Sequence, residues 1–178
     1  MAADPITNPA TPTAVFGKDA VTAALADHAA CSAALRGLKD LIVDAKWDRK
    51  ELTLTVAPET IIAAMQAAKA AGYNFFEDAT AVDWYPSDTP AAPRFQISYS
   101  LLSHSLKQRI RIVARISGDD PRIDSITSVW PSANFYEREI FDLFGVHFPG
   151  HPRLTRIMMP ENWEGHPLRK DYPVEGYR

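Results

Sequence analysis

Two pairs of side chains in the last third of the chain have residue types that could do chemistry. Glu137 and Glu139 could form an acid–base pair or bind a metal ion, and His147 and His151 have the i, i+4 spacing of a zinc-binding helix. At about 100° per residue, glutamates two positions apart on a helix point to different flanks and cannot share one ion. The histidines stand among glycines and prolines, which disfavour a helix there. We therefore expect neither pair to be catalytic or to hold a metal.

The helix that carries the two glutamates is predicted over residues 134–144, ending before Gly145, because glycine favours the end of a helix. Charged residues take its two flanks, where Arg138 and Asp142 are four positions apart and are expected to pair on the surface. Its apolar positions recur with helical spacing and form one face: Tyr136, Ile140, Leu143 and Phe144. Such a helix is suited to docking.

The segment that follows, residues 149–178, is predicted to be an extended arm. It contains five prolines, which preclude long helices. It also carries many large apolar side chains: Leu154, Ile157, Met158, Met159, Trp163, Leu168, Tyr172 and Tyr177. A segment this apolar should lie across a surface, either its own sheet or a partner. Arginine and aromatic residues are the types that dominate interface energetics.

These motifs resemble the C subunit of the proton-pumping NADH–quinone oxidoreductase, respiratory complex I. The family's signature block and terminal block match Glu137, Arg138, Glu139, Asp142, Gly145, Phe148, Gly150, His151, Pro152, Arg156, Ile157 and Met158, then Pro167, Leu168, Arg169, Lys170, Asp171, Tyr172 and Pro173. The resemblance implies that this region, with Trp163, contacts partner subunits. Arg169 and Lys170 are expected to meet carboxylates of a partner. Thr155 departs from the pattern, because the family usually has a basic residue there.

The resemblance implies a structural subunit of the peripheral arm that holds no cofactor and is not catalytic alone. Its partners would be the larger quinone-site subunit and the cluster-bearing subunits, which hold FMN and iron–sulfur clusters. The whole enzyme would pass electrons from NADH to quinone and translocate protons, on the cytoplasmic side of a bacterial membrane. Two alternatives stay open: the corresponding subunit of a membrane-bound hydrogenase or complex-I-like dehydrogenase, and a free-standing metal-dependent hydrolase built on the His and Glu residues.

The composition is compatible with a scaffold and excludes several other classes. The single cysteine, Cys31, cannot build a disulfide or a four-thiolate cluster, and it is expected to be a buried small hydrophobe. No apolar run approaches the roughly 20 residues that span a bilayer, and the N-terminus lacks the features of a signal peptide. A net charge of −3 argues against a nucleic-acid binder.

The upstream elements predict one α+β domain over residues 15–148, after a disordered tail, residues 1–14. A helix is expected over residues 18–34, and a second one between Pro58 and Gly72. Strands are expected at 41–45, 52–56, 75–85, 94–101 and 109–116, the last two with strict alternation. We expect a mixed or largely antiparallel sheet with helices on one face. Four cations share one face of the last strand, which is either solvated or opposite an acidic partner: Lys107, Arg109, Arg111 and Arg115.

Overall fold

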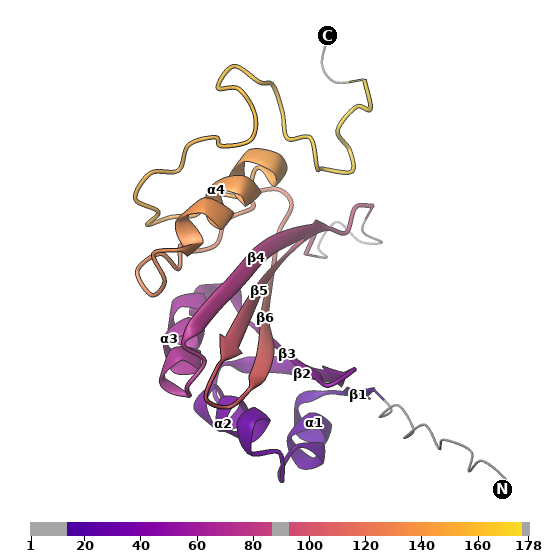
Figure 1. Ribbon diagram of the computed structural model, residues 1–178. Helices are drawn as coiled ribbons and strands as arrows, with labels where there is room; N and C mark the ends of the chain where they lie inside the picture. Colours follow the sequence, from indigo (N-terminus) through magenta and orange to yellow (C-terminus); the bar gives the residue numbers. More distant parts are fainter. Residues whose placement is uncertain (1–13, 87–92, 176–178) are drawn as a thin grey trace, which may run out of the picture.

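The computed structural model describes residues 14–86 and 93–175 (Figure 1). Within them, the strands form one mixed sheet in the order β1-β2-β3-β6-β5-β4, in which only β3 and β6 pair in parallel. The strands are β1 (Val15–Phe16), β2 (Ile42–Asp48), β3 (Glu51–Val56), β4 (Phe75–Asp83), β5 (Phe95–Ser103) and β6 (Gln108–Ile116). The α+β class is confirmed. The predicted tail, apart from Ala14, lies outside the described residues.

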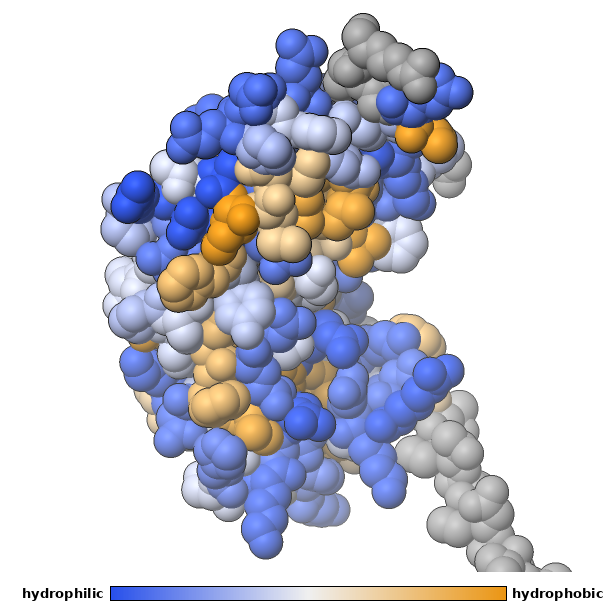
Figure 2. All heavy atoms as spheres, turned by 45° about the horizontal axis from the view of Figure 1, so that its top comes forward, coloured by the Kyte–Doolittle hydropathy of each residue, from blue (hydrophilic) through white to orange (hydrophobic). Residues whose placement is uncertain are grey.

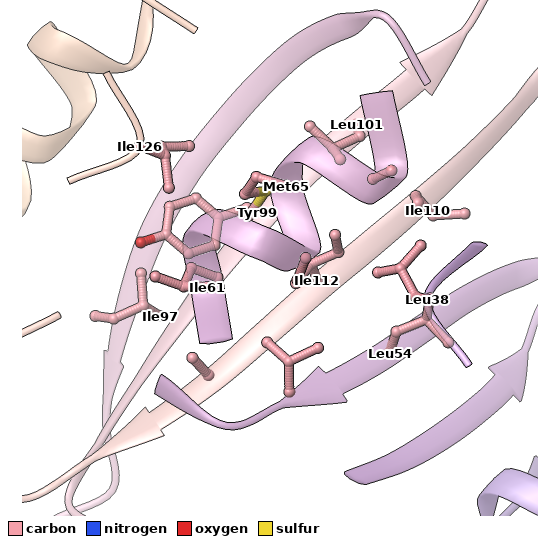
Figure 3. Close-up of a cluster of buried hydrophobic side chains, with 14 of the residues drawn as sticks. Leu38, Leu54, Ile61, Met65, Ile97, Tyr99, Leu101, Ile110, Ile112 and Ile126 are labelled. Atoms are coloured by element: carbon pink, nitrogen blue, oxygen red, sulfur yellow. The ribbon is translucent and has the colours of Figure 1, made fainter. Parts of the chain in front are cut away.

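The core lies between one face of the sheet and the N-terminal helices (Figure 3). Alternation puts the apolar residues of β5 and β6 on one face, as the sequence predicts, and α3 (Ile61–Ala70) covers them. Figure 3 labels ten buried side chains of this core, from several elements: Leu38, Leu54, Ile61, Met65, Ile97, Tyr99, Leu101, Ile110, Ile112 and Ile126. Full burial of one such side chain contributes about 1.5–3 kcal/mol.

The predicted single helix over residues 18–34 is wrong, because two helices occupy this region. They are α1 (Lys18–Ala24) and α2 (Ala29–Gly37). His28 stands before α2 with an extended backbone, and its Nδ1 accepts a hydrogen bond from the N–H of Cys31 (3.4 Å). A side chain that caps a new helix in this way competes with continuation of the previous one. Gly37 is the last residue of α2.

The second predicted helix starts as a short 3-10 turn, η1 (Pro58–Thr60), that leads into α3. Pro58 fits the first turn of a helix, because the N–H group that proline lacks would have no partner there. Gly72 follows the end of α3 with φ 99°, which is the left-handed conformation that glycine tolerates best. The expectation of a helix between these two residues is confirmed.

The charged face of β6 lies opposite the core, and two of its arginines pair within the sheet. Arg109 lies 3.0 Å from Glu77, and Arg111 lies 3.1 Å from Glu51. Both pairs are largely exposed, so each contributes less than about 1 kcal/mol. These pairs favour a solvated sheet face over a contact with an acidic partner.

The last helix, α4 (Ala133–Phe144), packs against β4 and lies at the top of Figure 1. The rings of Tyr136 and Phe76 meet edge to face at 5.5 Å, and the Tyr136 hydroxyl donates to the carbonyl of Glu77 (3.1 Å). After α4, residues 145–175 contain neither a helix nor a named strand. In the part of the chain that the structure describes, no helix has both the length and the apolar character needed to cross a membrane.

Candidate docking site

The family signature and the terminal block, residues 137–173, surround the C-terminal end of α4. The helix ends at Gly145, whose φ of 71° is left-handed, so the predicted helix over residues 134–144 is confirmed to within one residue. Gly145 also has close neighbours. A Cβ there would come within 2.5 Å of the His166 ring and 2.6 Å of the Arg169 guanidinium. The conformation and the contacts both require glycine.

Replacing Gly145 with alanine should therefore lower the free energy of unfolding more than the same change at Gly150. Both residues have positive φ, which costs an alanine about 1–2 kcal/mol. Only the alanine at position 145 also displaces side chains that are held by hydrogen bonds, since nothing lies within 4 Å of a Cβ at Gly150. Urea unfolding of Gly145→Ala and Gly150→Ala measures the difference. Equal losses in the two variants would show that the contacts at Gly145 do not matter.

Glu137 is fully buried, which corrects its expected place on a charged flank. Its Oε2 accepts from the Ser125 hydroxyl (2.6 Å), and its Oε1 accepts from the N–H of Ile126 (2.8 Å). Burial raises the pKa of Glu137 to about 7, although these two hydrogen bonds oppose the shift. Glu139 lies exposed on another side of the helix. The two glutamates do not converge, as helix geometry predicts, and Glu137 instead joins α4 to residues 125–126.

Asp142 is the second buried carboxylate of α4, and it binds the turn that follows Arg156. Its Oδ2 accepts from the N–H groups of Ile157 (2.9 Å), Met158 (2.7 Å) and Met159 (2.8 Å), while Oδ1 accepts from Arg156 (2.5 Å). Burial alone would raise the pKa of Asp142, but these donors hold it below its ordinary value. The side chain of Asp142 therefore acts as an internal anion.

The expected surface pair between Arg138 and Asp142 is wrong. Arg138 instead donates to the carbonyls of Thr155 (3.0 Å) and Arg156 (3.1 Å). Only the backbone of Thr155 takes part, so its departure from the family pattern removes neither of these contacts. Arg156 also donates through Nη2 to the carbonyls of Trp163 (3.0 Å) and Gly165 (3.1 Å). The Arg156 guanidinium thus joins its own turn to α4 and to residues 163–165.

Residues 166–169 form a second attachment, to the last turn of α4. The final carbonyls of a helix have no partner within the helix, and basic groups near them are favourable. These bonds join His166 Nδ1 to Asp142 O (2.9 Å), Leu168 N to Leu143 O (3.0 Å), and Arg169 Nε to Phe144 O (2.5 Å). Arg169 is therefore already engaged within the chain, which leaves Lys170 as the exposed cation of the pair expected to meet a partner.

A third attachment fixes the terminal block to the end of β4. Arg94 makes two hydrogen bonds to the nearly buried Asp83 (2.9 and 2.7 Å) and two to Asp171 (2.9 and 2.7 Å). The N–H of Lys170 also donates to Asp83 (3.0 Å). Burial would raise the pKa of Asp83, but Arg94 and neighbouring N–H groups hold it below its ordinary value. Residues 149–175 therefore make many polar contacts with their own domain.

Between these attachments, four apolar side chains remain exposed, and we call them the apolar ridge: Ile157, Met158, Trp163 and Leu168. Met158 is 61% exposed and Leu168 is 52% exposed, although their backbones are fixed to α4. In Figure 2 the top of Figure 1 is turned forward, and hydrophobic residues gather on the upper half of the face shown. Exposed apolar groups on a fixed backbone are typical of a docking surface, because little entropy is lost on binding.

His151 and the prolines of the signature lie outside helices and strands. His151 Nδ1 accepts from the N–H of Arg153 (3.0 Å), so its Nε2 carries the proton and donates to the carbonyl of Asn134 (3.2 Å). His151 is therefore held by backbone groups on both sides of its ring. Pro152 and Pro173 are exposed, whereas Pro167 is half-buried.

In residues 14–86 and 93–175, no three His, Cys, Asp or Glu side chains are grouped so that they could hold a metal ion. Cys31 is fully buried, as predicted, and burial raises the pKa of its thiol to about 11, which makes it unreactive. The side chains of this region bind residues 155–171 to the domain and leave the apolar ridge exposed.

Comparisons with known proteins show the family to which the chain belongs. The family model described as "Respiratory-chain NADH dehydrogenase, 30 Kd subunit" matches residues 54–178. The NADH-quinone oxidoreductase C subunit of Citrifermentans bemidjiense is 44% identical over 136 residues, which are 76% of this chain and 82% of that protein. The same subunit of Trichlorobacter lovleyi is 46% identical, with the same coverage of both chains.

Two solved structures are also similar. One, described as "Nqo5 of the trypsin-resistant fragment (1-134)", is 35% identical with a TM-score of 0.54, and the match covers 58% of this chain and 83% of that one. The other belongs to the membrane-bound sulfane sulfur reductase, an archaeal respiratory membrane complex, with a TM-score of 0.69 over 84% of this chain and 86% of that one. At 24% identity the second shows the fold alone. From the family model and the relatives together, the chain belongs to the 30 Kd subunit family of the respiratory-chain NADH dehydrogenase, the C subunits of NADH–quinone oxidoreductase.

Proposed function

We propose that this chain is a non-catalytic, cofactor-free structural subunit of the peripheral arm of NADH–quinone oxidoreductase, and that the apolar ridge binds a neighbouring subunit. One observation supports this most. Two buried carboxylates, Asp83 and Asp142, and four arginines hold residues 155–171 on the domain. Met158 and Leu168 stay exposed between the attachments. An isolated domain gains nothing from fixing an exposed apolar surface, whereas a docking subunit gains affinity.

In the assembled enzyme, electrons would pass from NADH through FMN and iron–sulfur clusters of other subunits to quinone, coupled to proton translocation. This chain would contribute by position alone, packed against the larger quinone-site subunit and the cluster-bearing subunits on the cytoplasmic side of the membrane. The relatives are named as subunits of NADH-quinone oxidoreductase, which supports the assignment to this enzyme. The burial of Glu137 and the internal bonds of Asp142 support a role that is structural and not catalytic.

A second candidate is the corresponding subunit of a membrane-bound hydrogenase or another complex-I-like dehydrogenase. The fold shared with the subunit of the sulfane sulfur reductase complex favours it, because the same fold serves in another respiratory complex. The electron donor and acceptor separate the two candidates. Membranes that oxidise NADH with quinone support the first, whereas hydrogen as the electron donor, or a sulfur compound as the electron acceptor, supports the second.

The experiment that tests the proposal is to tag this chain and purify it from gentle detergent extracts. NADH:quinone activity and flavin should co-purify with the tagged chain, while the isolated recombinant chain should be colourless and inactive with NADH. A flavin or iron–sulfur absorption band in the isolated chain would contradict the proposal. Stoichiometric metal together with hydrolase activity would instead support the free-standing hydrolase.

Limited proteolysis should separate the domain from its C-terminal segment in the isolated chain. Residues 149–175 are held by polar contacts and have few buried apolar side chains, so they should open more often than the sheet. Trypsin should cut after Arg153 and Lys170, which are exposed, and both sites should be protected in the complex. The trypsin-resistant fragment known for the relative Nqo5 supports this division. Equal cleavage rates in the free and assembled states would contradict a partner on this segment.

A further inference from the structure

Arg94, the residue before β5, binds two different carboxylates through two edges of its guanidinium group. Its Nε and Nη2 donate to Asp83 (2.9 and 2.7 Å), and its Nη1 and Nη2 donate to Asp171 (2.9 and 2.7 Å). Each pair is bidentate, the geometry in which arginine recognises a carboxylate most specifically. The side chain of Asp83 is 2% exposed, whereas that of Asp171 is 42% exposed. One pair therefore belongs to the interior of the domain, and the other belongs to its surface.

The interior pair holds Arg94 in place without help from Asp171. Asp83 is the last residue of β4, which pairs with β5, and it also accepts a hydrogen bond from the N–H of Tyr85 (3.0 Å). The guanidinium of Arg94 lies 4.8 Å from the centroid of the Tyr85 ring and 4.9 Å from that of the Phe95 ring, and such rings attract its charge. All these contacts lie within the domain. We therefore expect the Nη1–Nη2 edge to keep its direction when Asp171 leaves.

Gly118 gives the Arg94 side chain the space that it needs. It stands two positions after the end of β6, and a Cβ there would come within 2.8 Å of Arg94 Cδ and 3.0 Å of Arg94 Cβ. The backbone of Gly118 is not left-handed, so the close approach, and not φ, is what requires glycine. Arg94 cannot easily move aside, because its Cβ is fixed to the backbone and its guanidinium is fixed to Asp83. An alanine at position 118 would displace the guanidinium from both carboxylates.

The terminal block binds to this site through two neighbouring groups. Besides the carboxylate of Asp171, the N–H of Lys170 donates to Asp83 Oδ2 (3.0 Å), the oxygen that also accepts from Arg94 Nη2. The hydrogen bonds from Arg94 hold the pKa of Asp171 below its ordinary value, so this carboxylate is charged at neutral pH. Asp171 and Arg94 are 77 positions apart in the chain. Residues 170–171 therefore bind the domain as a short ligand would, with one carboxylate and one N–H group.

We propose that Arg94, paired with Asp83 and given room by Gly118, forms a carboxylate-binding site that exists before its ligand arrives. The ligand is Asp171 of the same chain, and it acts as a latch for the terminal block. With Asp171 in the site the block is closed on the domain, and without it the block opens while the site stays intact. Leu168 of the apolar ridge lies in the same block, so the latch also favours assembly. This link to assembly rests on the docking role proposed above.

Hydrogen exchange measured by NMR in the isolated chain tests the site through two reporters. The Nε–H of Arg94 reports the pair with Asp83, and the amide of Lys170 reports the closed block. In Asp171→Ala, the Lys170 amide should exchange roughly tenfold faster, because a charge-assisted pair is lost, while the Arg94 Nε–H keeps its wild-type rate. In Gly118→Ala, both should exchange faster.

Asp119→Ala is the matched control, because it changes the exposed residue next to Gly118 and should leave both rates unchanged. Faster exchange of the Arg94 Nε–H in Asp171→Ala overturns the proposal, since the site would then depend on its ligand. Unchanged exchange of the Lys170 amide in that variant overturns it as well. Wild-type rates in Gly118→Ala, or equal acceleration in Asp119→Ala, refute the role of Gly118. If Gly118→Ala does not fold, Asp171→Ala decides, because Asp171 lies outside the sheet.

The yield of the complex separates this inference from the proposed function. When the tagged chain is purified from membranes, the yield of the complex should fall several-fold in Asp171→Ala and Gly118→Ala and stay at the wild-type level in Asp119→Ala. Exchange rates as expected together with a normal yield support the carboxylate site and refute the docking role of the terminal block. Wild-type exchange in Asp171→Ala together with a reduced yield refutes the carboxylate site and supports the docking role.

Discussion

Asp142→Ala should release the turn at residues 156–159 from α4 and reduce assembly of the complex. The change leaves three N–H groups and the Arg156 guanidinium without their shared acceptor. Removing one partner of a buried ion pair costs about 3–5 kcal/mol. We expect this loss to appear locally, because the sheet keeps its own core and residues 155–171 are held mainly by polar bonds.

Hydrogen exchange followed by mass spectrometry measures the effect on the isolated chain. The amides of Ile157, Met158 and Met159 should lose their protection in Asp142→Ala, and partly in Asp142→Asn, which keeps one carbonyl acceptor. Glu139→Gln is the control on the same helix, because Glu139 is exposed, and its exchange should match the wild type. In membranes, quinone-dependent NADH oxidation should fall with the yield of the complex. Wild-type exchange and wild-type activity in Asp142→Ala would refute the role given to Asp142.

Glu137 should make the chain less stable as the pH rises through neutrality. Its pKa is about 7 in the folded chain and is the ordinary 4.5 when the chain unfolds, so the folded state binds the proton more tightly. The contribution of Glu137 to the free energy of unfolding is therefore largest below pH 4.5 and falls between pH 4.5 and 7. At 1.36 kcal/mol per pKa unit, the fall amounts to about 3 kcal/mol.

The variant Glu137→Gln isolates this contribution. Glutamine keeps an acceptor for the N–H of Ile126 and offers a donor to Ser125, but it does not ionise. Its free energy of unfolding, measured by urea at several pH values, should not fall between pH 5 and 7, whereas that of the wild type and of Glu139→Gln should fall relative to it. The lowered pKa values of His151 and His166 make stability rise with pH in all three proteins, so their effect cancels in the comparison. Asp83 and Asp142 have lowered pKa values, so their contributions are lost only in acid, below this pH window. The same slope in Glu137→Gln and the wild type would show that another group is responsible.

The parts of the fold that the sequence predicts are those set by local periodicity. Strict alternation locates β5 and β6, and glycine with positive φ marks the end of α4 at Gly145. The break between α1 and α2 was missed, because alanine-rich sequence favours continuation and the capping by His28 is visible only in three dimensions. The separate docking role of residues 149–178 stays a prediction.

The burial of Glu137 and Asp142 could not be predicted from hydropathy, because carboxylates are normally exposed. Their donors come from residues 125–126 and 156–159, which only the tertiary fold brings to α4. One signal for Glu137 was nevertheless present. Ala133, Glu137 and Ile140 follow the i, i+4, i+7 spacing of one helix face, so a carboxylate falls inside a buried stripe. For Asp142 the sequence offers a nearby arginine at i−4, which suggested the wrong partner.

The bonds between residues 166–169 and the last carbonyls of α4 have a consequence for the order of folding. The carbonyls of Asp142, Leu143 and Phe144 point in one direction only after the helix has formed, so this docking cannot precede helix formation. The loop to be closed is about 25 residues long, and its closure entropy rises only slowly with length. During synthesis, α4 leaves the ribosome before its capping residues do, and its final turn remains open to water or to a chaperone until residues 166–169 follow.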